Sequence, residues 1–367
     1  MRSIKTFVAA LAVAMLLSTG AFAGADLNEV GALLVYPVIW AAPGYQVPAD
    51  DDGGVMGGLE TFLTITNAGP DDVVAHVSYI NGDMYDEYQY CYECDFQIPL
   101  TGNDTETLVI SSGPGGTHIT AEDLYLDLAC PWPYGMLVVA LEDEDGETIT
   151  DNILLGEEVI VNYRDGMALS IPAIPFQGGS GNGDRAYSFD DAEYGKMPRI
   201  VAADFLAPNV NQHASAMLSL FTLGFERQFP PLVDCSVIGF DAHEHPFSAS
   251  FQFGCWGIWD LYDISPEFYH PNLGLFNNDP HGPANDTHGW LQLNCRVDSN
   301  PAAADGFEAN GGVHGAIIQT QYSGSRLPAG SDVPFGSAAM WGRVLYQSVT
   351  TGDEVELILE GPAGGLD

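Results

Sequence analysis

The sequence predicts an all-β protein made of two tandem antiparallel β-sandwich domains, of the jelly-roll or immunoglobulin-like type. Its apolar runs are short and alternate with polar residues, and they end at turn signals rich in Gly, Pro, Asn and Asp. The same order of runs begins again after a glycine-rich stretch at 177–198. We therefore expect β-sandwich domains at 24–176 and 199–367, joined by a linker at 177–198.

The first domain is expected to contain a series of strands, at 59–66, 73–80, 94–100, 106–111 and 136–141, with further runs at 147–155 and 157–174. The turn signal Asn67-Ala-Gly-Pro70 between the first two runs predicts that they form a hairpin. A short helix is expected at 120–129, with Thr120 as its N-cap and Asp123 three residues later.

The second half repeats this order of elements. The run at 216–223 resembles the one at 59–66, and 235–241 resembles 73–80. We also match 255–261 with 94–100, and 315–322 with 135–141. This pattern predicts a duplication, although any sandwich produces similar short strands. The glycine-rich stretch could equally be a long surface loop within one larger fold.

The N-terminus has the features of a secretory signal. Arg2 and Lys5 precede an apolar run at 7–17, and Ala21-Phe22-Ala23 fits a signal-peptidase site. We expect cleavage after Ala23 and a secreted protein, either extracellular or periplasmic. No later apolar stretch reaches spanning length, so we expect no membrane insertion after cleavage.

The charge balance is strongly acidic, with 50 Asp and Glu residues against 10 Lys and Arg. No Lys or Arg occurs between Gly24 and Tyr163. Nucleic acid is therefore not expected as a partner, because phosphate binding depends on cationic side chains. Cations, or basic patches on other proteins, are the natural counterparts of this surface.

The cysteines predict disulfide bonds. All six follow the signal sequence, and each half carries three: Cys91, Cys94, Cys130, Cys235, Cys255 and Cys295. An even count in an exported chain indicates bridges, with 15 possible pairings among six cysteines. If all six pair, the odd count per half requires at least one bridge between the halves.

The best transition-metal candidate is the sequence Asp241-Ala-His243-Glu-His245. Residues two apart on a strand share one face, so Asp241, His243 and His245 are candidate ligands of Zn²⁺ or Cu²⁺. The alternative is an ordinary polar strand end, because Pro246 follows at once.

Two acidic glycine-containing loops are candidate calcium sites. Carboxylate oxygens suit Ca²⁺, although neither loop has the spacing of an EF-hand, and acidic hairpin tips are often only solvated. The candidate ligands are Asp50 and Asp52 in the first loop, and Asp143, Asp145 and Glu147 in the second.

The stretch from Val30 to Ala42 is the most apolar one after the signal sequence. It is predicted to be a core strand. The alternative is a strand donated to another copy or to another extracellular protein, which would support self-association.

Several segments resemble a group of uncharacterised secreted bacterial β-sandwich proteins. They are LLVYP at 33–37, TFLTITNAGP at 61–70, HVSYING at 76–82, PLTGNDT at 99–105 and IPAIPFQGG at 171–179. The resemblance implies export and a β fold, and it implies no activity, ligand or catalytic residue.

Catalytic signatures are absent from the sequence: there is no G-x-S-x-G elbow, P-loop or H-E-x-x-H motif. Together, these features favour a non-catalytic structural or adhesion protein that is extracellular or lies at the cell surface. We expect it to be acidic and stabilised by disulfides, and self-assembly is a further possibility. A secreted module that binds cations or carbohydrate is the first alternative, and a secreted hydrolase is the second.

Overall fold

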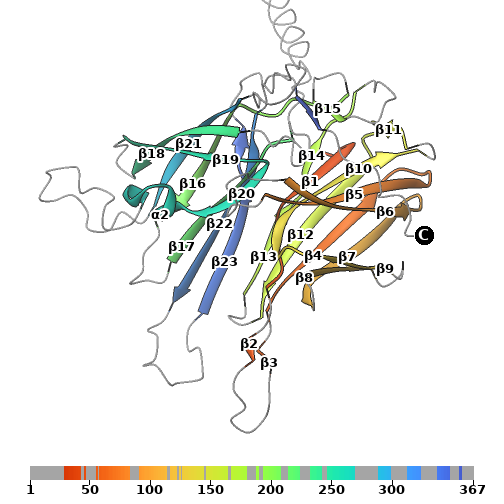
Figure 1. Cartoon of the computed structure of the whole chain (residues 1–367), viewed down its shortest axis with the longest axis horizontal. Helices are drawn as coiled ribbons and strands as arrows, with labels where there is room; N and C mark the ends of the chain where they lie inside the picture. Colours follow the sequence, from red (N-terminus) through yellow and green to blue (C-terminus); the bar gives the residue numbers. More distant parts are fainter. Residues whose placement is uncertain are drawn as a thin grey trace, which may run out of the picture.

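The computed structural model is an all-β structure, as predicted, and its strands form two β-sandwiches (Figure 1). The structure describes residues 29–42, 45–46, 55–56, 58–82, 91–113, 116–121, 124, 126–143, 146–163, 167–179, 187–189, 193–207, 214–223, 232–241, 246–268, 288–298, 312–323, 337–347 and 355–357. The predicted signal sequence lies outside these residues. Within them, no helix is long and apolar enough to cross a bilayer.

The first sandwich consists of two antiparallel sheets. Sheet I has the order β14-β1-β10-β5-β6, with β11 added beside β10. Its strands are β1 (Leu33–Trp40), β5 (Val73–Gly82), β6 (Cys91–Leu100), β10 (Tyr134–Glu142), β11 (Thr148–Ile149) and β14 (Ile174–Phe176). Sheet II has the order β13-β12-β4-β7-β8-β9. Its strands are β4 (Leu59–Asn67), β7 (Asp104–Gly113), β8 (Gly116–Ala121), β9 (Leu126–Cys130), β12 (Leu154–Asn162) and β13 (Met167–Pro172).

The second sandwich is built in the same way. Sheet III has the order β19-β18-β21-β16-β24. Its strands are β16 (Ile200–Leu206), β18 (Leu232–Asp241), β19 (Pro246–Phe253), β21 (His288–Asp298) and β24 (Tyr346–Gln347). Sheet IV has the order β20-β17-β22-β23. Its strands are β17 (Ala214–Phe221), β20 (Trp256–Asp260), β22 (His314–Ser323) and β23 (Ser337–Val344). One helical turn, α2 (Leu261–Ile264), and a 3-10 turn, η1 (Pro266–Phe268), follow β20.

Two small pairs complete the described strands. β2 (Tyr45–Gln46) pairs with β3 (Val55–Met56), and β15 (Tyr187–Phe189) pairs with β25 (Val355–Leu357). The second pair joins the segment between the sandwiches to a segment close to the C-terminus.

The two sandwiches share one strand order. Sheet I matches sheet III strand by strand, as β14-β1-β10-β5-β6 against β24-β16-β21-β18-β19, and sheet II matches sheet IV as β13-β12-β4-β7 against β23-β22-β17-β20. The order along the chain is preserved in both. This supports the predicted duplication, and it agrees with two of the four matches drawn from sequence, β4 with β17 and β5 with β18. The other two matches were wrong: β20 corresponds to β7, and β22 corresponds to β12.

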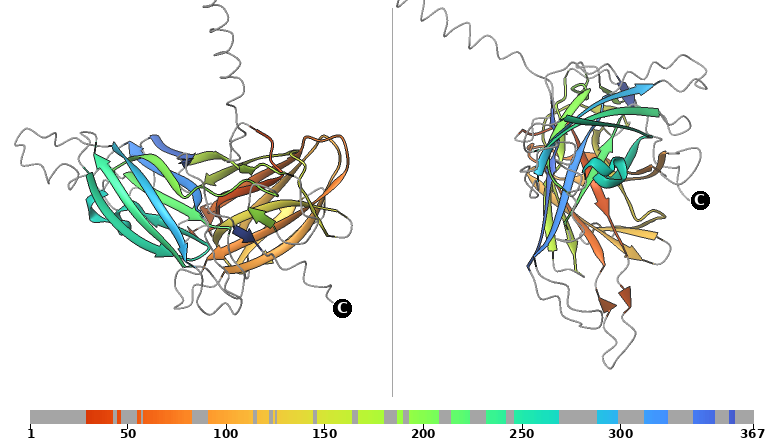
Figure 2. Two further views of the ribbon diagram at one scale, coloured as in Figure 1. Left: turned by 90° about the horizontal axis from the view of Figure 1, so that it is seen from above. Right: turned by 90° about the vertical axis from the view of Figure 1, so that its left-hand side faces the viewer.

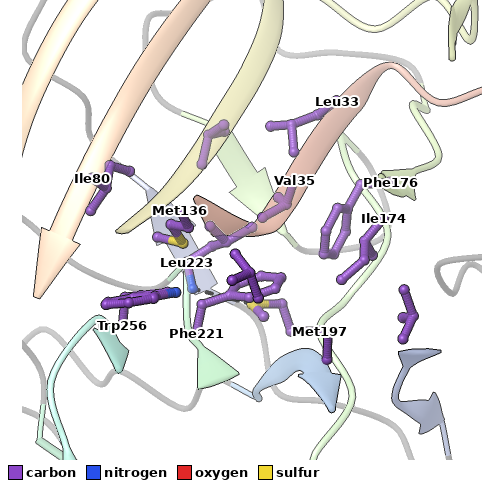
Figure 3. Packing of buried hydrophobic residues seen from close by; sticks show 14 of the residues in the cluster. Leu33, Val35, Ile80, Met136, Ile174, Phe176, Met197, Phe221, Leu223 and Trp256 are labelled. Atoms are coloured by element: carbon purple, nitrogen blue, oxygen red, sulfur yellow. Dashed lines mark hydrogen bonds between the residues drawn. The ribbon is translucent and has the colours of Figure 1, made fainter. Parts of the chain in front are cut away.

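Each sandwich has its own apolar core, and a third core lies between the sandwiches. Leu34, Leu63, Val77 and Leu137 belong to the core of the first sandwich, and Val201, Leu218, Val237 and Leu293 to that of the second. The third core joins the outer face of sheet I to the outer face of sheet IV, with the inward residues of β12 and β13 at its side. We call it the seam cluster, and Figure 3 shows part of it: Leu33, Val35, Ile80, Met136, Ile174, Phe176, Met197, Phe221, Leu223 and Trp256. The two sandwiches lie side by side across it (Figure 2).

Strand β1 is buried on both faces because it belongs to two cores. Leu34 and Tyr36 point into the first sandwich, whereas Leu33 and Val35 point into the seam cluster. β10 behaves in the same way, with Leu137 on one face and Met136 on the other. Burial on both faces explains why these strands are continuous apolar runs rather than alternating ones.

A β-bulge at Pro37 ties β1 to the second sandwich. The register of β1 against β10 shifts between Tyr36 and Ile39. The Pro37 carbonyl accepts hydrogen bonds from Ser219 Oγ at 2.8 Å and from Trp256 Nε1 at 2.9 Å. A bulge leaves backbone groups outside the ladder, and here the second sandwich binds the freed carbonyl.

Two local predictions were wrong. The predicted helix at 120–129 is replaced by β8 and β9, because Thr117, Ile119 and Ala121 alternate into the core and the two strands pair with each other. The predicted hairpin between β4 and β5 is a crossover, since β4 belongs to sheet II and β5 to sheet I.

The side chain of Asn67 shapes this crossover. Its Nδ2 donates to the carbonyls of Asp71, at 2.8 Å, and Thr101, at 3.1 Å, while its Oδ1 accepts from the Gly69 amide at 2.9 Å. These bonds turn the chain away from its own sheet, so the turn residues are consistent with a change of sheet as well as with a hairpin.

The limits of the two predicted domains stay a prediction. Parts of the stretch at 177–198 lie in the seam cluster, however, because Tyr187, Phe189, Tyr194 and Met197 are all buried there.

Candidate functional site

The predicted transition-metal site is only partly within the described residues. Asp241 ends β18 and is 4% exposed. His243 and His245 lie outside the described residues, so this site stays a prediction. In the part of the chain that the structure describes, no three or more His, Cys, Asp or Glu side chains gather in a group able to hold a metal ion.

The second candidate calcium loop is a tight turn after β10. The Glu147 amide donates to Asp143 Oδ1 at 2.9 Å, and the Gly146 amide donates to the Asp143 carbonyl at 3.1 Å. Gly146 has a φ of 76°, which favours glycine. One oxygen of Asp143 is thus used in the turn itself. Asp145, Asp50 and Asp52 lie outside the described residues, and calcium binding stays a prediction.

All six cysteines form disulfides. Cys94 pairs with Cys130 inside the first sandwich, and Cys235 pairs with Cys295 across β18 and β21. The third bridge, Cys91–Cys255, joins β6 of the first sandwich to the residue before β20 of the second. This is the bridge between halves that the odd cysteine count requires.

The most concentrated group of buried charges lies on the outer face of sheet I, beside the seam cluster. Its centre is His76 on β5, whose Nδ1 is 2.7 Å from Glu142 Oε1 and whose Nε2 is 3.6 Å from Asp95 Oδ1. Gln97 Nε2 donates to Glu142 Oε2 at 3.1 Å, and Tyr187 Oη donates to Glu142 Oε1 at 2.8 Å. We call these five residues the buried charge network.

Strand register brings the network together. His76 and Gln97 are directly paired on β5 and β6, and Asp95 lies two residues before Gln97 on the same face. Glu142 is the last residue of β10, the strand on the other side of β5. Tyr187 arrives from β15 and covers the group, so His76 is only 2% exposed.

The network holds a charged imidazolium between two carboxylates. Burial alone would lower the pKa of His76, but the close contacts with the Asp95 and Glu142 carboxylates outweigh it and raise that pKa to about 9. Burial alone would likewise raise the pKa of Glu142, but the bonds and charge of His76 bring it below its ordinary value. His76 is therefore protonated at neutral pH.

A separate carboxyl group is buried at the side of the seam cluster. Glu158 on β12 has no exposed surface, and neither of its oxygens makes a hydrogen bond of normal geometry to a described residue. Burial raises its pKa well above the ordinary value, and the nearby Val38 amide offsets this only in part. Burial therefore favours the neutral, protonated form of Glu158.

These buried groups are suited to stabilising the packing beside the seam cluster rather than to meeting a substrate. A general acid or base must come within hydrogen-bond reach of the reacting group, and the 2% exposure of His76 does not allow this in the present structure. No member of the network was predicted from the sequence. The sequence feature that could have revealed the network is a charged residue within an apolar run: His76 in VVAHVSYI at 73–80, and Glu142 in MLVVALE at 136–142.

Comparisons with known proteins add little to this site. No family model and no curated protein matches the chain. Among solved structures, a candidate secreted protein from Parabacteroides distasonis matches at 9% sequence identity with a TM-score of 0.18, covering 80% of this chain and 92% of the other. A similarity of this size carries no argument about fold or function, so the predicted resemblance to secreted bacterial proteins stays a prediction.

Proposed function

We propose that this protein is an exported, non-catalytic structural component at the cell surface or in the extracellular space. The observation that carries the proposal is the seam, in which two sandwiches share a continuous apolar core closed by the Cys91–Cys255 disulfide. Domains within one chain usually meet across smaller, more polar interfaces that permit relative motion. A shared core with a covalent bridge favours a rigid body instead.

The chemistry of the chain supports an oxidising destination. Three disulfides among the described residues are typical of proteins that work outside the cytoplasm. Fifty acidic residues against ten basic ones keep such a body soluble at high concentration. Removal of residues 1–23 would also remove Arg2 and Lys5, which makes the mature protein still more acidic.

Self-association through the strand from Val30 to Ala42 is a further part of this proposal. In the structure, β1 occupies the position between β14 and β10 of its own sheet. Donation to another copy therefore requires an exchange of β1 between molecules. Because β1 completes two cores whether its own molecule or a neighbour supplies it, deletion of residues 24–42 should unfold the protein in both cases. The oligomeric state separates the two possibilities, since exchange of β1 requires an oligomer.

The test of the structural role uses residues 24–367 produced in an oxidising compartment. Size-exclusion chromatography with light scattering and negative-stain electron microscopy should reveal fibres or large oligomers, with and without added Ca²⁺. A monomer at every concentration tested would contradict assembly. Hydrolysis of ester, glycoside or peptide substrates above the level of a Trp256→Ala control would contradict the non-catalytic role.

A further inference from the structure

The outer face of sheet III carries an exposed aromatic pair on its two central strands. Phe240 on β18 and Trp290 on β21 are directly paired, and their rings stack at 4.2 Å between centroids with 10° between planes. Trp290 is 37% exposed. Phe240 covers one face of the indole, and β16, the next strand, lies on the other side of Trp290.

The outward residues next to this pair on β18 and β21 are uncharged, and most of them are polar. Along β18 and β21, the outward positions next to the pair are Ile238, which is 44% exposed, and Gln292, followed by Ser236 and Asn294. The side chains of Gln292 and Asn294 make no hydrogen bond to any other described residue. On β16, Asp204 pairs with Trp290 and Ala202 pairs with Gln292.

The platform is fixed by the core beneath it. The inward positions beside the pair are Gly239 and Gly289. A Cβ at Gly239 would lie 2.2 Å from the Phe247 ring, and one at Gly289 would lie 2.8 Å from the Phe205 ring. These core rings therefore pack directly against the backbone that carries Phe240 and Trp290. A preorganised surface loses little freedom when it binds.

We propose that this face, centred on Trp290, binds a neutral polysaccharide. A sugar ring has an apolar C–H face and a rim of hydroxyl groups. The electron-rich face of the indole attracts polarised C–H groups, while free amides and hydroxyls beside it can bind the rim and fix its orientation. The outward row from Phe240 to Asp234 spans about 20 Å at the usual rise per residue, enough for several sugar units in a chain.

Other occupants fit this face less well. A polyanion is disfavoured because the chain has 50 acidic and 10 basic residues, and Asp204 lies beside the indole. A protein partner or a second copy would favour a larger apolar patch, whereas Ser236, Asn294 and Gln292 separate Trp290 from the exposed Leu232. The proposal does not depend on the structural role proposed above.

The test is affinity gel electrophoresis of residues 24–367 in gels that contain β-glucan, arabinoxylan, galactomannan or glycogen, with alginate as the polyanion. At least one neutral polysaccharide should retard the wild-type protein, and Trp290→Ala should weaken retardation by about tenfold or more, as expected for a central aromatic contact. The matched control is Tyr262→Ala, because Tyr262 is 48% exposed on α2, outside this face. It should behave as the wild type.

A second variant, Gln292→Ala, keeps the proposal testable if Trp290→Ala does not fold. Circular dichroism checks that each variant is folded. Gln292→Ala should weaken retardation while it leaves the melting temperature unchanged. The proposal is overturned if no neutral polysaccharide retards the protein, if alginate alone does, or if Trp290→Ala is retarded like the wild type. A change in oligomeric state caused by Trp290→Ala would also overturn it, because the occupant would then be a second copy.

Discussion

Sheets I and III have the same strand order but opposite surroundings. The outer face of sheet I is buried in the seam cluster, whereas the outer face of sheet III is exposed around Trp290. The sequences of the two strands explain the difference. β10 is the apolar run MLVVAL at 136–141 and is buried on both faces, whereas apolar and polar residues alternate along its counterpart β21, HGWLQLNC at 288–295. A sheet with this strand order can thus lie inside the molecule or at its surface, and the residues on its outer face decide between these two positions.

The largest expected effect concerns the bridge across the seam. Cys91→Ala with Cys255→Ala opens a disulfide with a sequence separation of 164, against 36 for Cys94 and Cys130. Chain-entropy arithmetic gives losses of about 5 and about 4 kcal/mol. Urea unfolding of both double variants measures the difference. An equal or smaller loss for the Cys91 pair would indicate that the seam alone fixes the two sandwiches.

The second expected effect contrasts two tryptophans. Trp256 is buried in the seam cluster and bonded to Pro37, so Trp256→Ala should cost about 3–5 kcal/mol of unfolding free energy. Trp290→Ala, on the exposed face, should cost less than about 1 kcal/mol. Trp256→Phe removes the hydrogen bond together with part of the ring volume, so its cost should lie between these two values. Similar losses for the two alanine variants would contradict the contrast between buried and exposed faces.

The third effect is a pH dependence that only the buried face should show. The pKa of His76 is raised to about 9 in the folded protein, so its contribution is complete below about pH 6.5 and is lost as the pH rises through 9. The loss is at most about 3 kcal/mol. Unfolding free energies at pH 6 and pH 9.5 should therefore differ less in His76→Gln than in the wild type.

The control for this measurement is His118→Gln. His118 lies on β8 and pairs with Asp127, which is 71% exposed, so solvent screens this pair. Its removal should leave the pH dependence of the wild type intact. A pH dependence that persists in His76→Gln would assign the effect to other groups.

The smallest effect concerns Glu158. Its folded pKa is raised, so keeping it protonated lowers stability increasingly as the pH rises above the unfolded value of about 4.5. Glu158→Met should therefore match or exceed wild-type stability at pH 5 and gain about 1–3 kcal/mol over it by pH 8. Chemical unfolding at the two pH values measures this gain. A variant that is less stable than wild type at pH 8 would show that the carboxyl has a partner outside the described residues.

Local sequence pattern predicts many of the strands, and the predictions that were wrong share a common cause. Alternation places strands such as β4, β5 and β7 correctly, because period two is a property of one strand. It does not say to which sheet a strand belongs, so the crossover at Asn67 was read as a hairpin. At 120–129, Leu124, Leu126 and Leu128 alternate as a strand requires, but the capping pattern at Thr120 obscured this.

The buried charge network could not be predicted for a similar reason. Its residues come from β5, β6, β10 and β15, and only the sheet order and the position of β15 bring them together. A histidine within an apolar run reveals burial but not its partners. The cysteine count, in contrast, required a bridge between halves, because that argument depends on number alone.

The seam joins unlike faces, since sheet I of one repeat meets sheet IV of the other, and this is a heterologous, head-to-tail contact. Such a contact does not close on itself. A third repeat could in principle stack on sheet III as sheet IV stacks on sheet I, and so on without limit. Polar residues interrupt both terminal faces: Gln292 and Asn294 lie beside Trp290 on sheet III, and Thr64, Thr66 and Thr107 lie on sheet II. The outward residues of these two sheets therefore act as caps, and substitutions that make both of them apolar would convert a two-repeat body into a growing filament.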